Sequence, residues 1–198
     1  GLIVPGVTAP GVPVWVSDGT EAAAALPAPE EAAALAACEL LLATGAGKVW
    51  LCPVAEGGWQ AAFDLAGAEA ELDTIVCACD QEADAKAFAA MLTAAANDRR
   101  ERVGIIAMAG DGEALTLAGA VNCERVMITA GSGTYKDCDS PLCLAAAVAG
   151  KLLGRTAPDE SLSAAVLEGL SAVSPARSET EIETLLRGGV VPAEWVGG

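Results

Sequence analysis

Four near-continuous apolar segments, separated by helical patterns, limit the folds open to this chain more than any other feature. The candidate strands are Val49–Val54, Thr74–Cys79, Arg102–Met108 and Glu124–Ala130. Their residues do not alternate between apolar and polar, which is typical of strands buried on both faces of a parallel sheet. The alternation of strands and helices therefore predicts an α/β fold, with a mainly parallel sheet and helices on both of its faces.

The clearest helix is expected at Glu82–Asn97, where apolar residues recur along one face. We expect Asp80 to cap its start, and Arg99 and Arg100 to close its last turn, where cations suit the helix dipole. Three further helices are expected at Glu30–Leu42, at Asp111–Val121 and from Ser140 to Gly154.

A capping box, Ser178-x-x-Glu181, indicates the start of the last helix. Ile182, Leu185 and Leu186 then have the spacing of a buried stripe, and a glycine follows as a stop. This predicts a short helix packed on the rest of the fold.

The N-terminal part is less regular. Leu2–Val7 and Val12–Val16 have the composition of strands, but Pro5, Pro10 and Pro13 favour short edge strands, since proline cannot donate to a sheet ladder. The stretch Arg155–Pro175 matches no pattern well. We expect residues 1–198 to form a single α/β core domain.

Charge and residue types exclude several classes of function. The net charge of −16, from 27 acidic and 11 basic residues, repels phosphate, so we expect no nucleic-acid binding. Histidine is absent, so neither a Ser-His-Asp nor a Cys-His centre can be built from this chain. No apolar run reaches 18 residues, so we expect no membrane span and name no membrane partner.

Seven cysteines at positions 38, 52, 77, 79, 123, 138 and 143 fit no paired zinc pattern. Those that lie in apolar runs, where a free thiol behaves as a small hydrophobe, are Cys38, Cys52, Cys77 and Cys143. We therefore expect reduced structural thiols, with no metal and no cofactor.

The segment Thr44–Lys48 (TGAGK) resembles part of a phosphate-binding loop. The full loop needs a glycine at position 42, which is leucine, and a Ser or Thr after the lysine, where Val49 stands. The segment also runs from a helix into a strand, the reverse of the required order. It is better explained as the turn that ends a helix.

A second glycine-rich segment, Gly131–Thr134, follows a strand. A dinucleotide fingerprint would need a glycine where Lys136 stands, and Asp137 and Asp139 would repel a pyrophosphate, so we expect a flexible loop. Asp137, Asp139 and Glu113 have the ligand type that calcium or magnesium prefers, but their spacing matches no ordered metal loop, and a solvated acidic loop is favoured.

The C-terminal half resembles the contractile tail sheath proteins of phages. An Arg-rich step from a helix into a strand is similar to Asp98–Val103, and an Asn-x-Glu-Arg-Val strand is similar to Asn122–Val126. An alanine-rich helix with Val-Ala-Gly matches Ala147–Gly150, and a capped helix with Leu-Leu and a Gly-Val stop resembles Glu181–Val190. The first strands of the family fit the N-terminal part more loosely, at Gly6–Ser17 and Gly47–Trp50.

The resemblance implies a structural subunit of a phage or phage-like tail, assembled in the bacterial host cytoplasm and located in the virion tail. Its partners would be neighbouring sheath subunits, as a homo-oligomer, and the tail tube protein. Family members continue beyond the Gly-Val stop into a tube-contacting domain. This chain is therefore expected to be a truncated core fragment, and the apolar end formed by Val190, Val191, Trp195 and Val196 to be unfinished.

No motif assigns a catalytic, cofactor-binding or metal-binding residue, so we expect the chain not to be an enzyme. Two alternatives stay open. One is a small-molecule-binding or enzymatic α/β domain with a site at the strand ends, around Gly110–Gly112 and Gly131–Asp139. The other is a redox protein using Cys77 and Cys79, although neither cysteine has a nearby base to lower its pKa.

Overall fold

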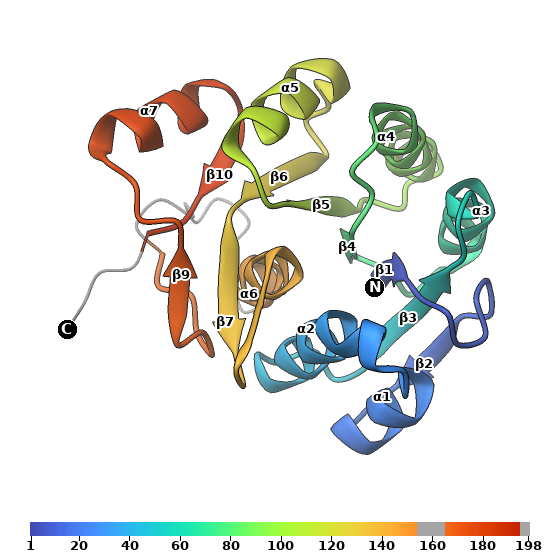
Figure 1. Ribbon diagram of the computed structural model, residues 1–198. Helices are drawn as coiled ribbons and strands as arrows, with labels where there is room; N and C mark the ends of the chain where they lie inside the picture. The colour runs from blue at the N-terminus through green and yellow to red at the C-terminus, as the bar shows by residue number, and fades with distance from the viewer. Residues whose placement is uncertain (154–164, 195–198) are drawn as a thin grey trace.

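A seven-stranded sheet runs through the middle of the molecule, as seen in the computed structural model (Figure 1), which describes residues 1–153 and 165–194. In spatial order its strands are β10 (Val190–Pro192), β6 (Val126–Ala130), β5 (Val103–Met108), β4 (Thr74–Cys77), β1 (Leu2–Pro5), β3 (Val49–Val54) and β2 (Val14–Val16). All neighbours are parallel except β2, which pairs antiparallel with β3.

Helices cover both faces of this sheet, which confirms the predicted fold class. They are α1 (Gly19–Ala25), α2 (Ala32–Ala43), α3 (Trp59–Ala68), α4 (Glu82–Asn97), α5 (Asp111–Val121), α6 (Pro141–Leu153) and α7 (Glu179–Arg187), with a 3-10 turn at Pro29–Glu31. Within the described ranges, no helix combines the length and apolarity needed to cross a membrane.

Alternate strand residues enter two separate cores. Leu2 and Val4 pack with α1, α2 and α6 on one face, whereas Ile3 packs with α3, α4, α5 and α7 on the other. This division explains why the strands read as continuous apolar runs, because each residue of a central strand is buried on one face or the other. In Figure 1 the second group of helices lines the upper and right-hand side of the sheet.

The expected edge position of the first strand is wrong, whereas that of β2 is confirmed. β1 lies inside the sheet, between β3 and β4. Its ladder with β4 joins only Leu2 and Ile3, while Pro5 pairs solely with β3, opposite Val54. The missing N–H of Pro5 is harmless because the ladder on its other side has already ended.

The segment expected as a flexible loop forms part of a second sheet. Its strands, in the order β8-β7-β9, are β8 (Cys138–Ser140), β7 (Ser132–Tyr135) and β9 (Ala172–Ser174), all antiparallel. Lys136 and Asp137 both have left-handed φ values, of 46° and 66°, as a two-residue hairpin turn requires. Ser132–Thr134 therefore lies in a strand, because Gly133 and Thr134 pair with β8 on one side and β9 on the other, while Gly131 precedes the strand.

Helix α6 packs between the two sheets, against β5 on one side and β7 on the other (Figure 1). Every residue from Leu142 to Gly150 is buried. At Gly150 an added Cβ would meet Thr44 Oγ1 and would lie 2.6 Å from Thr44 Cβ, at the end of α2. The small residues of α6 thus allow a close approach of α2 and α6.

The C-terminal helix is partly as expected. The capping box is present, because Ser178 N donates to Glu181 Oε2 at 2.7 Å and Glu181 N donates to Ser178 Oγ at 3.4 Å. Leu185 is buried, but Leu186 is 60% exposed, so the buried face of α7 is narrower than the Ile182, Leu185 and Leu186 stripe that the sequence predicted. Val190 and Val191 are not unfinished, because they pair with β6 as the seventh strand; Trp195 and Val196 lie outside the described residues.

The Arg-rich segment after α4 makes hydrogen bonds to the C-terminal ends of two helices, α4 and α3. Arg99 has a left-handed φ of 62°, and its N–H and that of Arg100 donate to Ala96 O and Ala95 O, both at 2.9 Å, which ends α4. The guanidinium of Arg100 instead donates to Gly67 O at 2.6 Å, at the end of α3. The last turn of α4 is therefore closed by the backbone N–H groups of Arg99 and Arg100, and not by their side-chain cations as the sequence predicted.

Buried Arg102 continues this step, with Nη1 donating to Ala66 O at 2.7 Å and Nη2 to Glu69 O. Two arginines thus bind the free carbonyl groups at the end of α3, where cations are favourable. The predicted cap at the start of α4 is wrong, since the N-cap residue is Gln81, and the one described group that donates to the Asp80 carboxylate is Gln81 Nε2, at 3.1 Å.

Candidate functional site

An open cavity of about 720 Å³ lies where β1, β4 and β5 end. We name it the strand-end cavity. Its apolar wall includes Pro5, Ala34, Ala78, Met108, Leu117 and Leu142. The ends of parallel strands are where α/β folds most often bind ligands, and this volume lies within the range of small-molecule sites.

Carboxylates surround this cavity. They belong to Glu30, before α2, to Asp80 and Glu82, at the start of α4, and to Glu113, in the first turn of α5. Among the described residues that line it there is neither a lysine nor an arginine. The cavity therefore disfavours phosphate and other anions, and it suits a neutral or cationic group.

The side chains around the cavity do not form a nucleophile and base pair within the described part of the chain. Its two hydroxyl side chains are Thr116 and Ser140. Ser140 Oγ accepts from Leu142 N at 3.2 Å, and Thr116 Oγ1 donates to Gly112 O at 2.9 Å. The Thr116 hydroxyl is thus engaged within α5 and that of Ser140 with the first turn of α6, and among the described residues neither contacts a group that would activate it.

The regions expected for an alternative site do not come together. Gly112 lines the strand-end cavity, whereas Gly131 and Gly133 are buried at the start of the small sheet. Asp137 and Asp139 lie on the β7–β8 hairpin, whereas Glu113 lies in the first turn of α5. In residues 1–153 and 165–194, no group of three or more acidic or cysteine side chains is placed to hold a metal ion.

Thr44–Lys48 has the structure expected of a helix end. Thr44 is the C-cap of α2, Gly45 has a left-handed φ of 110°, and Ala46 N donates to Leu41 O at 3.0 Å. The chain then enters β3 at Val49. This segment closes a helix and has no phosphate-loop geometry.

All seven cysteines are free thiols, and five of them are buried. Burial raises the pKa of Cys38 and of Cys143 to about 12, and that of Cys52 to about 11. Burial also raises the pKa of Cys77 well above its ordinary value, assisted by a hydrogen bond with Cys79. A thiol held in this way is a poor nucleophile, which argues against the redox alternative.

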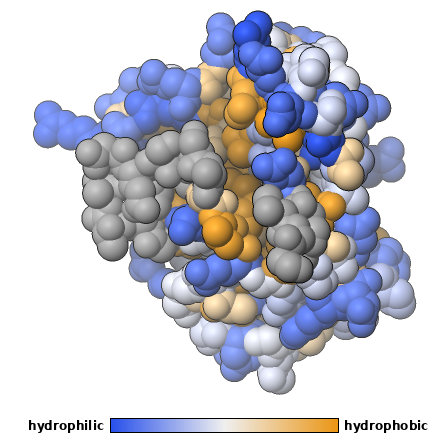
Figure 2. All heavy atoms as spheres, turned by 90° about the vertical axis from the view of Figure 1, so that its left-hand side faces the viewer, coloured by the Kyte–Doolittle hydropathy of each residue, from blue (hydrophilic) through white to orange (hydrophobic). Residues whose placement is uncertain are grey.

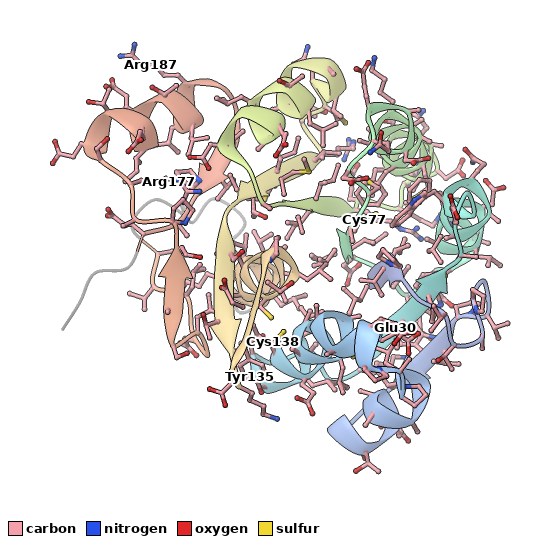
Figure 3. All side chains as sticks on the ribbon, in the orientation of Figure 1. Glu30, Cys77, Tyr135, Cys138, Arg177 and Arg187 are labelled. Carbon is pink, nitrogen blue, oxygen red and sulfur yellow. The ribbon has the colours of Figure 1, made fainter. Side chains whose placement is uncertain are left out.

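A buried arginine that the sequence did not mark joins four segments. Arg177 donates from Nε to Asp111 Oδ2 at 3.0 Å and from Nη2 to Asp111 Oδ1 at 2.6 Å. It also donates to Ala130 O and Ala193 O, each at 3.1 Å. Figure 3 shows Arg177 beside β10, below α7. Its hydrogen bonds to Asp111 and its positive charge lower the pKa of that carboxyl group.

A second buried node fixes the loop between β1 and β2. Glu31 is buried and accepts from Val7 N and Thr8 N at 2.9 Å, from Thr8 Oγ1 at 3.0 Å and from Ala28 N at 3.1 Å. Burial alone would raise the pKa of Glu31, but these hydrogen bonds outweigh it and lower the pKa. The carboxylate thus holds the loop next to the strand-end cavity.

No protein-family model matches the sequence, and no curated protein matches it, but solved structures do. A chain of the anti-feeding prophage (AFP) baseplate is similar with a TM-score of 0.70 and 21% identity, covering 98% of this chain and 57% of its own length. A chain of the AFP helical sheath in the contracted state is similar with a TM-score of 0.66 and 18% identity, covering 99% of this chain and 58% of its own length.

A sheath tail protein from Desulfitobacterium hafniense is also similar, with a TM-score of 0.71 and 11% identity, over 97% of this chain and 68% of its own. A sheath tail protein from Listeria innocua is similar with a TM-score of 0.68 and 10% identity, covering 98% of this chain and 65% of its own length. The chain has the fold of contractile tail sheath proteins, as its sequence motifs indicated. It spans 57% and 58% of the length of the two AFP chains.

Proposed function

We propose that this chain is a structural module of a contractile tail sheath, in which copies stack as rings around a tail tube and shorten to drive it through a cell envelope. The observation that carries the proposal is the likeness in fold, which extends over 97–99% of the chain in each of the four structures. Residues 1–198 would act as one domain of a longer sheath subunit, because the chain spans only part of each similar protein.

The partners follow from this role. Neighbouring sheath subunits would contact the exposed faces of the domain, and the tail tube protein would bind a part of the subunit outside this chain. The protein would be located in the virion tail after assembly in the host cytoplasm. It would carry out no catalysis and bind neither nucleic acid nor membrane.

Exposed apolar surface supports an assembling module. Figure 2 shows apolar side chains gathered in a central band on the face that lies at the left of Figure 1. Large apolar side chains that are exposed elsewhere in the described chain include Val7 and Val12, in the loop before β2. Apolar patches on a strongly charged protein usually mark contacts with other chains.

Electron microscopy of the full-length parent protein tests the proposal. Hollow cylinders of stacked rings, or helical tubes, are the expected result. A parent that stays monomeric and binds a nucleotide or metal tightly would instead show that the fold serves a different function here.

The strand-end cavity supports a second candidate function, a small-molecule-binding α/β domain. A thermal-shift screen of amines, nucleotides and divalent metals tests it, because a ligand at 100 times its Kd stabilises a protein by about 2.7 kcal/mol. A shift of several degrees with one ligand class would favour this function. Shifts of about one degree or less across the screen would count against it.

A further inference from the structure

We draw no further inference here: the strongest candidate, the uncharged loop between β1 and β2 with its exposed Val7 and Val12, is held in place by Glu31, but nothing in the structure shows what covers it.

Discussion

Arg177 binds Asp111 through two parallel hydrogen bonds across 66 residues of sequence, with the arginine side chain only 1% exposed. The pair ties the segment before α7 to the start of α5. Through Ala130 O and Ala193 O the same guanidinium also fixes the end of β6 and the chain beyond β10. It therefore determines where the chain leaves the sheet.

Removing the carboxylate of this pair should be costly. Asp111→Ala leaves the buried guanidinium of Arg177 without its counter-charge, and we expect the free energy of unfolding to fall by about 2–4 kcal/mol. Urea unfolding followed by circular dichroism measures this. Arg187→Ala removes an exposed pair with Glu183 and should cost about 0.5 kcal/mol or less. Similar losses for the two variants would contradict the assigned role of Arg177.

Acid should destabilise the protein through Asp111 and Glu31. Both carboxyl groups have folded-state pKa values below their ordinary values of 3.8 and 4.5. The stability that they contribute is therefore fully present above the unfolded-state pKa and is lost as the pH falls through the folded-state pKa.

Glu31→Gln tests the second of these groups, since it keeps the shape of the side chain without a titrating proton. Between pH 7 and pH about 3, the wild-type protein should lose more unfolding free energy than the variant. Equal losses in the two proteins would show that Glu31 is not held in its charged form.

The end of α3 should depend on Arg102 more than on Arg100. Arg102 is buried and donates to Ala66 O and Glu69 O, whereas the side chain of Arg100 is 34% exposed. Arg102→Met leaves buried carbonyl groups without donors, and we expect a loss of about 2–3 kcal/mol. Arg100→Met should cost about 1 kcal/mol. Amide hydrogen exchange should quicken at the end of α3 in the first variant, and an unchanged rate there would argue against the assigned contacts.

Gly150 should be intolerant of a methyl group. Gly150→Ala places a Cβ against Thr44, at the contact of α2 and α6, and should destabilise the protein by about 1–3 kcal/mol. Gly119→Ala, in α5, meets no atom within 4 Å and should stabilise it by about 0.5–1 kcal/mol. Thermal unfolding distinguishes the opposite signs, and a gain at both positions would mean that α2 and α6 are not closely packed.

The sequence predicts most strands of the large sheet and most helices that cover it, because the patterns that mark them are local. Val49–Val54, Glu82–Asn97 and Asp111–Val121 are found as β3, α4 and α5 with the expected bounds. The place of β1 could not be predicted, because it depends on the pairing of Leu2 with Leu51 and Val76, far away in the chain. A proline excludes a strand from the inside of a sheet only where the strand would have to pair with neighbours on both sides at the proline itself. At Pro5 only the pairing with β3 remains.

The small sheet and the set of carboxylates around the cavity could not be predicted, for the same reason. Gly131–Thr134 has the composition of a loop, and its residues from Ser132 on form part of β7 only because β8 and β9 pair with them. The carboxylates of the strand-end cavity are spread over more than 80 positions, from Glu30 to Glu113, and have no common motif. Only the fold brings them to one edge.

Cryo-electron microscopy of the full-length parent tests the central claim most directly. The account expects helical or stacked-ring tubes in which this α/β fold, with its seven-stranded sheet and α6 between the two sheets, fits the density once in every repeating subunit. Tubes whose repeating density cannot hold this fold, or a parent that forms no tube at any concentration, would contradict it.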